Sequence, residues 1–483
     1  MSIIVDMDEL KKNYTKKEKL YHNTGNKINL FPFTTSATNK SLEVILEDLN
    51  VFKGIIGECI RIHYQYDLPS YFTKQNLIDE VTDKAEAYRD KNFEDILSHI
   101  LFDRQDNLFI FDINLMKFLN FKKRNKRIEE FALFIHDVFL SRLDKELYDQ
   151  YFKKDYTDKN NVLYQIVSET LPKLDEIASK NNKRINYYSG IKDITELFVN
   201  DIKTMLNEEK MFIEHFDKLL KYYFFYYISK LSFKLNNFFD NDKDTKIFFS
   251  LDWEALSQSR EAYKYGWKIL ELKCKNLFSH ANCLELLNHI NNIQPSTFIY
   301  DDIKLFVENI SDEEVKNLNN SIDQIDTFYS NIICQETNDS QFWDSFEKDY
   351  EAKNINEKNQ TQEKVQKLWH KINYWFKNKQ KGPYIKYSKW FIDFCKQNYL
   401  KSRGRLGLTL IIDRELLLLF TQISIKQSKE EKIRLTVLWK ELSKRGLNFD
   451  QYSKEAIVKF FERINNIEKK SDSGDAQYIK MIG

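Results

Sequence analysis

Apolar residues recur at three- and four-residue intervals over most of the chain, which predicts helices that each bury one face. Within 193–207, for example, Ile194, Phe198 and Ile202 fall on one side of a helix. The stretches with this pattern are Ser41–Tyr66, Ile128–Phe152, Asp193–Asn207, Lys210–Phe239 and Trp253–Ile293. The pattern predicts a mainly α fold, a multi-domain helical protein.

The most hydrophobic run is Leu219–Leu235, LLKYYFFYYISKLSFKL. Three lysines interrupt it, and it is short and aromatic for a membrane span, which needs about 20 apolar residues. We therefore expect a buried helix and no contact with a membrane. The first residues also lack the apolar core and the cleavage site of a signal peptide.

Two segments near the start depart from the helical pattern and introduce some N-terminal β structure. Lys27–Ser36, KINLFPFTTS, places β-type residues around Pro32 and predicts an extended segment. Leu108–Phe111 is a short apolar run that is typical of a strand. Glycine and proline number only 11 and 5 in 483 residues, which argues against β-sandwiches and glycine-rich phosphate loops.

The last part of the chain, residues 406–483, has the clearest local pattern and is named here the C-terminal unit. Leu408–Ile425 predicts an apolar helix, and Ser428–Glu431 has the form of a capping box that opens a second helix. Gly446 then supplies a left-handed stop. Ser453 is a predicted N-cap of a third helix, which buries Ala456, Ile457, Phe460, Phe461 and Ile464.

A β-hairpin is predicted to follow the third helix, because Ile467–Lys470 and Ala476–Ile482 flank Ser471–Gly474. Three helices followed by a two-stranded hairpin is the order of a winged helix, whose third helix can enter the major groove of DNA. The basic residues that would contact nucleic acid there are Lys454, Lys459, Lys469, Lys470 and Lys480. Glu455 and Glu462 offset part of this charge on the third helix, so a wing that packs on another protein stays an alternative.

The formal net charge is only +1, but its sign changes along the chain. Asp301–Thr361 contains fifteen acids and five lysines, whereas Val365–Arg405 contains nine lysines, two arginines and one acid. Either each segment is a solvated face, or the two segments pair with each other. Glu351–Glu363 is almost free of apolar residues and is the predicted linker.

Aromatic residues interleave with the positive charges of Val365–Arg405, as they do in proteins that stack on unpaired bases. We expect most of these rings to belong to the core, because aromatic side chains dominate core burial. Arg403 and Arg405 flank Gly404, so the backbone there can approach a phosphate closely, and both arginines are further nucleic-acid candidates.

Candidate catalytic and metal sites are weak. Cys274, His280, Cys283 and His289 lack the close ligand pair that zinc sites use, and the stretch predicts a continuous helix, so no metal is expected. Asp252, Glu271 and Lys273 imitate the spacing of a metal-dependent nuclease, but Glu271 and Lys273 fall in a helical pattern rather than a strand. Motifs of P-loop, dinucleotide, serine hydrolase and zinc protease sites are absent, so we expect no cofactor and no catalytic residue.

The five cysteines are odd in number and widely spaced, which is typical of a reducing compartment and predicts a cytoplasmic protein. The patterns together predict five regions. They are an N-terminal mixed, mostly helical domain (1–155), a helical domain (156–335), an acidic and polar linker (336–363), a basic aromatic helical segment (364–405) and a winged-helix domain (406–483).

The tail also carries a resemblance to a known family. Its segments GRLGLTLIIDRELLLLFT, RLTVLWKELSKRGLNFDQYSKEAIVKFFERIN and IEKKSDSGDAQYIKMI, with LFPFTTS near the start, resemble the DptG family. The resemblance is sharp over Gly404–Ile482 and faint elsewhere. It implies a non-catalytic subunit of a bacterial DNA phosphorothioation-dependent restriction system, an anti-phage defence, with DptF-like and DptH-like ATPase or translocase partners and DNA as a further partner.

Two alternatives remain open beside this interpretation. A winged-helix scaffold of an SMC-like defence complex would combine the same helical body with the same tail. A stand-alone nuclease acting through Asp252, Glu271 and Lys273 would need those side chains to converge.

Overall fold

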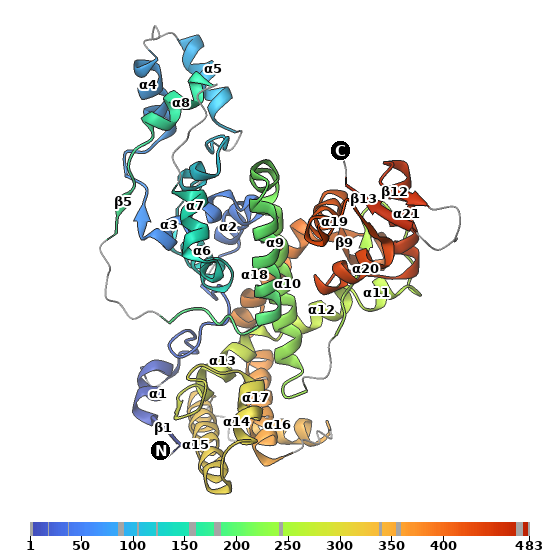
Figure 1. Cartoon of the computed structure of the whole chain (residues 1–483). Coiled ribbons are helices and arrows are strands. Elements are labelled where there is room, and N and C mark those ends of the chain that lie inside the picture. Colours follow the sequence, from blue (N-terminus) through green and yellow to red (C-terminus); the bar gives the residue numbers. More distant parts are fainter. Residues whose placement is uncertain are drawn as a thin grey trace.

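The computed structural model describes residues 3–481 except 18, 37, 86–90, 104–105, 122–123, 154–160, 178–184, 241–244, 338–340, 354–358 and 470–476. The fold is mainly α, as predicted: the described residues contain 21 α-helices and several small sheets (Figure 1). None of the described helices is long and apolar enough to span a membrane. The predicted linker lies partly outside the described residues, and the predicted domain boundaries stay predictions.

The helices of the first 170 residues are α1 (Met7–Tyr14), α2 (Asn39–Val51), α3 (Lys53–Tyr64), α4 (Lys74–Lys84), α5 (Lys91–Leu101), α6 (Lys126–Val138), α7 (Lys145–Phe152) and α8 (Val162–Thr170). The central helices are α9 (Lys192–Leu206), α10 (Glu209–Asn236), α11 (Glu261–Lys264), α12 (Trp267–Cys274), α13 (Leu277–Leu287), α14 (Tyr300–Val307), α15 (Asp312–Thr337), α16 (Phe342–Glu351), α17 (Gln360–Asn378) and α18 (Lys381–Asn398). Short strands pair as β1 (Ile4–Val5) with β7 (Ile290–Asn291), β2 (Thr15–Lys16) with β3 (Lys19–Leu20) and β4 (Tyr66–Asp67) with β5 (Asp175–Glu176).

Helix α10 is the centre of the core, which confirms the buried helix predicted from its hydrophobic run. Every residue from Tyr222 to Ser229 is buried, so the helix is covered on all sides. Its Phe224 ring lies 4.8 Å from Phe131 of α6 and 4.9 Å from Phe394 of α18. A helix that is apolar all round is stable in water only when neighbours surround it, as they do here.

Helices α4, α5 and α8 form a small arm with a hydrophobic cluster of its own, at one end of the molecule (Figure 1). The predicted strand at Leu108–Phe111 lies beside this arm and is wrong, because only an isolated bridge joins Leu108 to Phe102. The extended segment Lys27–Ser36 contains no helix or named strand and makes one bridge, from Asn29 to Tyr187.

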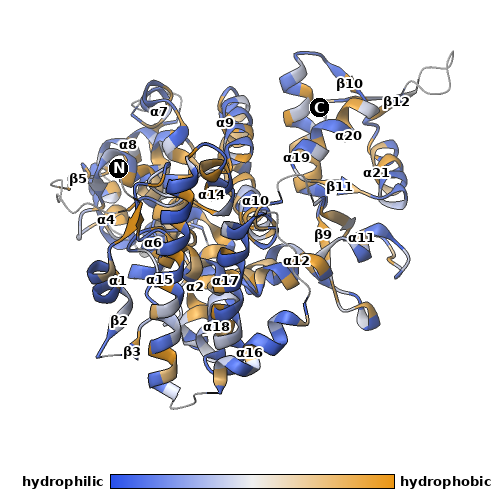
Figure 2. Ribbon diagram, turned by 90° about the horizontal axis from the view of Figure 1, so that it is seen from below, coloured by the Kyte–Doolittle hydropathy of each residue, from blue (hydrophilic) through white to orange (hydrophobic). Residues whose placement is uncertain are grey.

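A four-stranded sheet joins the C-terminal unit to the helical body. Its strands, in the order β11-β6-β9-β8, are β11 (Asn448–Phe449), β6 (Phe248–Leu251), β9 (Leu408–Ile412) and β8 (Leu400–Ser402). Strand β6 runs parallel to both β9 and β11. Figure 2 shows the C-terminal unit beside the helical body, with this sheet and α12 between them. The unit is therefore built partly from residues that lie about 160 positions earlier in the chain.

Two details at the start of the C-terminal unit correct the sequence prediction. Leu408–Ile412 is strand β9, and helix α19 (Arg414–Ser428) begins only after Asp413, whose carboxylate accepts the Leu416 N–H. The apolar run fits a strand because its neighbour β6 completes the sheet. Ser428 ends α19 instead of opening a helix, since its hydroxyl donates back to the Ile425 carbonyl and Lys429 adopts a left-handed conformation.

The rest of the unit contains β10 (Lys432–Arg434), α20 (Leu435–Lys444), α21 (Gln451–Arg463), β12 (Ile467–Lys469) and β13 (Gln477–Lys480). Gly446, at φ 78°, follows α20 and provides the predicted stop. The N-cap of α21 is Asp450 rather than Ser453, because the Asp450 carboxylate accepts the Ser453 N–H. Ile457 and Phe461 are buried as predicted, whereas Ile464 is exposed.

The predicted hairpin strands are present, and their predicted turn Ser471–Gly474 lies outside the described residues. Strand β13 pairs with β12 and also with β10, giving a three-stranded antiparallel sheet in the order β10-β13-β12. The C-terminal unit thus contains three helices and this sheet.

Candidate nucleic-acid interface

The outer face of the β10-β13-β12 sheet carries several basic side chains. Ile433 and Ile479 lie opposite each other and are both buried, so the alternate positions face outward. Those outward positions pair Lys432 with Lys480 and Arg434 with Tyr478. We name Lys432, Arg434, Tyr478 and Lys480 the wing face.

Like charges directly opposite each other destabilise a sheet, and Lys432 faces Lys480 across β10 and β13. Glu468 of β12 relieves part of the repulsion through an ion pair of 2.8 Å with Lys432. The Lys432 ammonium also lies 5.5 Å from the centre of the Tyr478 ring. Three cations against one carboxylate leave the wing face with a positive charge, which suits contact with phosphates.

The sequence prediction included Lys480 of the wing face but missed Lys432 and Arg434. The alternation Lys-Ile-Arg could have indicated both residues, because it is typical of a strand that buries its middle residue and exposes the other two. It was concealed because the preceding residues Ser428–Glu431 imitate a helix start. Lys469 lies in β12 opposite Gln477, and Lys470 lies outside the described residues.

Helix α21 carries the two other predicted lysines. Lys459 is exposed, and the Lys454 ammonium lies 5.9 Å from the ring of Trp439. Tyr452, near the start of the helix, keeps 66% of its surface exposed. This helix therefore offers one exposed lysine and one large exposed ring, with Glu455 between them in the sequence.

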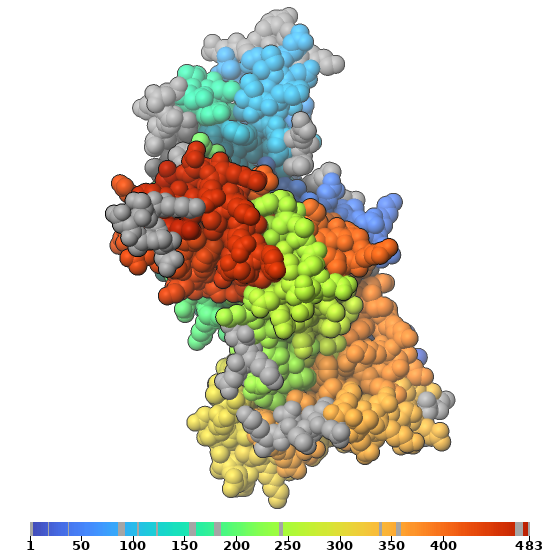
Figure 3. Space-filling model, turned by 90° about the vertical axis from the view of Figure 1, so that its right-hand side faces the viewer, coloured from blue at the N-terminus to red at the C-terminus, as the bar shows by residue number. Residues whose placement is uncertain are grey.

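A buried ion network missing from the sequence prediction anchors the first turn of α21. Arg260, which precedes α11, donates to both carboxylate oxygens of Asp450 at 2.6 and 3.0 Å. It also donates to Glu254 at 3.0 Å and to the Ser453 hydroxyl at 2.7 Å. Burial opposes ionisation of Asp450, but Arg260 and the backbone N–H groups of Ser453 and Ala262 together outweigh it, and the pKa of Asp450 is lowered overall. The network fixes α21 against residues 254–260. Figure 3 shows the C-terminal unit and this part of the chain as one continuous surface.

The structure separates the roles of Arg403 and Arg405. The Arg403 guanidinium donates to the carbonyls of Leu251 and Glu254 and to the hydroxyls of Ser250 and Thr409. These bonds connect the loop to β6 and β9, and burial lowers the pKa of Arg403. Arg405 is exposed, in a short 3₁₀ turn (Gly404–Leu406). Of the two arginines, Arg405 is the one whose side chain is presented to solvent.

The acidic and basic segments pair with each other along α15, α16 and α17. Lys371 of α17 contacts Asp326 at 2.6 Å, and Lys367 contacts Glu347 of α16 at 2.8 Å. Lys364 also pairs with Asp323. The second of the two alternatives for these segments therefore holds for α17, whose lysines are partly neutralised inside the protein.

The aromatic residues of the basic segment belong mainly to the core, as expected. The buried rings are Trp369, Trp375, Phe376, Tyr384, Tyr387, Trp390, Phe391, Phe394 and Tyr399. Phe376 and Tyr387 line a cavity, whereas stacking of bases on the other rings would require the helices to separate.

The cysteines and histidines of α12 and α13 contact separate partners. His280 Nδ1 lies 3.1 Å from the Tyr300 hydroxyl, and His289 Nδ1 lies 2.8 Å from the Glu285 carbonyl. Burial raises the pKa of Cys274 and of Cys283 to about 12, which opposes the thiolate form that zinc requires. Within the described ranges, no group of three or more His, Cys, Asp or Glu side chains is arranged to hold a metal ion.

The residues of the nuclease alternative do not share a strand. Glu271 and Lys273 lie on helix α12, and Glu271 pairs with Lys275 at 3.1 Å. Asp252 follows β6, and Lys401 donates to its carbonyl. The nuclease alternative thus loses the strand geometry on which it depended.

Comparison with known proteins adds no assignment. No model of a known protein family matches the chain, and no curated protein matches its sequence.

Proposed function

We propose that this chain is a non-catalytic subunit of a bacterial restriction complex linked to DNA phosphorothioation, and that its C-terminal unit is a winged helix that contacts DNA. The observation that carries the DNA contact is the wing face, where Lys432, Arg434 and Lys480 stand on adjacent strands of the β10-β13-β12 sheet. The assignment to phosphorothioation rests on the resemblance of Gly404–Ile482 to the DptG family.

The order of elements supports the winged helix. Helix α19, strand β10, helices α20 and α21, and then β12 and β13 follow one another, and β13 lies between the other two strands. In such a module the third helix and the wing approach the duplex together. Here the exposed Lys459 of α21 and the lysines of the wing face supply cations from both elements.

The lysines of α17 support a DNA contact through the C-terminal unit rather than through the helical body. The lysines of α17 contact acids of α15 and α16, so they are less available to phosphates than those of the wing face. The helical body then serves to bridge the DptF-like and DptH-like ATPase or translocase subunits, in the cytoplasm, while the C-terminal unit contacts DNA.

Co-purification tests the assignment to a complex. The full chain is expressed with a DptF-like and a DptH-like protein from a phosphorothioation gene cluster, and each is tested for retention on the tagged chain. We expect stable retention of at least one ATPase partner. Loss of both partners at low salt, or recovery of an SMC-type ATPase instead, contradicts the assignment.

A variant at Tyr452 distinguishes a DNA-contacting unit from one that binds a protein. Tyr452→Ala removes the large exposed ring of α21, and Val162→Ala in α8, where the valine is 67% exposed, is the matched control. If the unit contacts DNA, both variants retain the partners equally. Selective loss of partners with Tyr452→Ala indicates a protein-binding wing. DNA nicking by the isolated chain with magnesium contradicts the non-catalytic assignment.

A further inference from the structure

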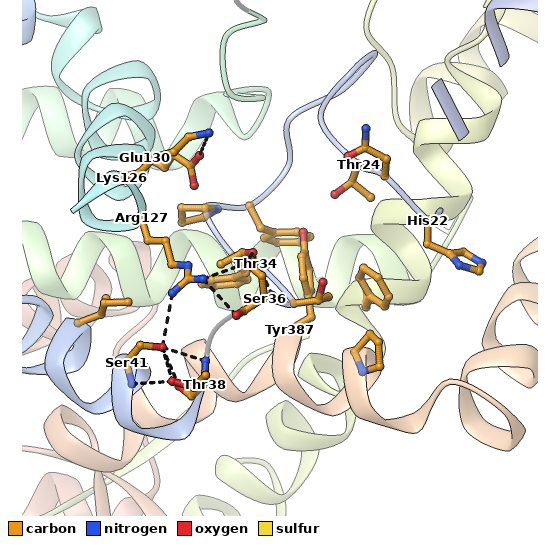
Figure 4. Close-up of a pocket in the computed structure, with 18 of the residues that line it drawn as sticks. His22, Thr24, Thr34, Ser36, Thr38, Ser41, Lys126, Arg127, Glu130 and Tyr387 are labelled. Atoms are coloured by element: carbon orange, nitrogen blue, oxygen red, sulfur yellow. Dashed lines mark hydrogen bonds and ion pairs between the residues drawn. The ribbon is translucent and has the colours of Figure 1, made fainter. Parts of the chain in front are cut away.

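A cavity of about 1120 Å³ lies in the helical body, where the extended segment Lys27–Ser36 passes the starts of three helices (Figure 4). Its wall includes residues 31–36 of that segment, the first turns of α2 and α6, and residues 380–387 of α18 and the turn before it. Ligand sites in proteins range from about 300 to 1000 Å³, so this space accepts a whole small molecule. No residue of the C-terminal unit lines it.

One side of the cavity is positively charged. Lys40, Lys126 and Arg127 line it, and Glu130 is the single carboxylate among the lining residues. Glu130 lies 3.8 Å from Lys126, a residue that is 85% exposed. Lys40 is exposed and has no ion-pair partner among the residues that the structure describes. Two of the three positive charges are therefore left without a carboxylate.

Among the residues that the structure describes, the hydrogen-bond partners of Arg127 are neutral oxygens. Its guanidinium donates to the carbonyl and the hydroxyl of Ser36, both at 3.1 Å, and lies 3.5 Å from the Ser41 hydroxyl. Figure 4 shows Arg127 between these two serines on the polar wall. Neutral partners orient the guanidinium without cancelling its charge, as is typical of an arginine that binds an oxyanion.

The helix starts at this wall carry charges of the unfavourable sign. Lys40, Lys126 and Lys381 lie in the first turns of α2, α6 and α18, where helix dipoles favour anions. The first turns of α2 and α18 contain no acid, and Glu129 of α6 is paired with Arg124 at 2.5 Å. An anion bound in the cavity would offset both the dipoles and the lysines.

The other side of the cavity is aromatic. The rings of Phe31 and Phe33 are stacked with centres 5.7 Å apart, and Tyr387 contacts both edge to face. His22 lies at the far end of the cavity from Arg127 (Figure 4), and burial lowers its pKa to about 3, so it adds no charge at neutral pH. A flat apolar group therefore suits this end, and an anion suits the other.

We infer that this cavity binds a nucleotide phosphate, with the phosphate at Arg127 and Lys40 and the base toward Phe31, Phe33 and Tyr387. Two kinds of ligand present a 5′-phosphate beside a base: a free mononucleotide and the 5′-phosphorylated end of a strand. The inference is independent of DNA contact by the wing face, because the two sites share no residue.

Calorimetric titration of the full chain at low salt tests the inference with AMP, adenosine, inorganic phosphate and an octanucleotide with or without a 5′-phosphate. We expect AMP to bind at least tenfold more tightly than adenosine, and phosphate to compete with it. Tighter binding of the phosphorylated octanucleotide than of AMP identifies a strand end as the source, and the reverse identifies a free nucleotide. A 5′-hydroxyl octanucleotide that binds equally well contradicts the inference.

Three variants locate the site. Arg127→Gln should weaken AMP binding at least tenfold, and Lys40→Gln about threefold to tenfold, because each removes a cation without a carboxylate partner. Lys12→Gln, at an exposed lysine of α1, is the matched control and should leave binding unchanged. Lys40→Gln breaks no side-chain hydrogen bond or ion pair within the described residues, so it keeps the test valid even if Arg127→Gln loosens the loop. Absence of AMP binding, or unchanged binding in both cavity variants, overturns the inference.

Discussion

Substituting Asp201 with alanine should loosen the C-terminal unit from the helical body, because it breaks a buried ion pair between them. Asp201 of α9 and Arg445, which follows α20, are both fully buried. Arg445 Nε and Nη2 donate to the two carboxylate oxygens at 2.8 and 2.6 Å. Tyr223 and Gln427 also donate to this carboxylate, at 2.6 and 2.9 Å. Four donors thus converge on one side chain at the junction.

The magnitude follows from the charge that the substitution leaves behind. Burial opposes the charged form of Arg445, but Asp201, Tyr223 and Glu441 together outweigh it and the pKa of Arg445 is raised overall. Removing one partner of a buried ion pair costs about 3–5 kcal/mol when the other charge stays uncompensated. The Glu441 carboxylate lies 3.3 Å from Arg445 and still compensates part of its charge, so we expect a loss near the lower end of that range. A loss within that range changes an opening equilibrium by roughly two to almost four orders of magnitude. Neutralising the arginine as well, in Asp201→Ala/Arg445→Met, should restore a large part of the loss.

Hydrogen–deuterium exchange read by mass spectrometry measures this opening directly, since amide protection reports local free energy. We expect the amides of α19, α20 and α21 to lose protection in Asp201→Ala, and those of α10 to change less. Glu196→Ala, at an exposed position of the same helix α9, is the control. If Asp201→Ala changes protection no more than Glu196→Ala, or if the double variant is as labile as the single one, the reasoning is refuted.

Three further predictions concern single side chains. Arg403→Ala should lower the free energy of unfolding by about 2–4 kcal/mol in urea titrations, because it leaves buried acceptors unpaired, whereas Arg405→Ala should change it by less than about 0.5 kcal/mol; equal losses would contradict this. Burial lowers the pKa of His280 well below 6.5. The unfolded chain therefore takes up a proton at this residue below pH 6.5 that the folded chain does not, so His280 should contribute about 1.4 kcal/mol per pH unit to the fall of the unfolding free energy there, and His280→Phe should reduce the slope by that amount. Lys371→Met, at a side chain that is 9% exposed, should cost about 1–3 kcal/mol, and Lys364→Met, at a more exposed pair, less than about 1 kcal/mol; thermal unfolding ranks the two.

The helices could be predicted from the sequence because their apolar spacing is a local signal. Helices α9 and α10 lie close to their predicted ranges. Strand β9 was assigned to a helix, since a five-residue apolar run that leads directly into a helix has no period of its own. This run forms a strand because it pairs with β6, about 160 residues earlier, and a local sequence pattern does not reveal that partner.

The candidate nucleic-acid interface could also be predicted only where the role of a residue depends on its local sequence. Lys459 and Lys480 were recognised by their charge and place in a helix or strand, and both are exposed. Arg403 has the same charge, but three of the four oxygens that accept its hydrogen bonds belong to residues 250–254, so its structural role depends on long-range contacts. Lys432 was missed because β10 pairs with β13, 46 positions further on, and not with its sequence neighbours.

Salt-dependent DNA binding tests the central claim most directly. The full chain and the variant Lys432→Gln/Arg434→Gln/Lys480→Gln are titrated with a duplex across a range of salt concentrations, beside Lys12→Gln/Lys210→Gln/Lys396→Gln as the control with equal charge. Each phosphate contact contributes about 0.9 to the slope of log K against log salt, so the wing variant should lose up to about 2.7. The control should keep the slope of the unmodified chain. Absence of binding at low salt, or equal slopes in all three proteins, would contradict the account.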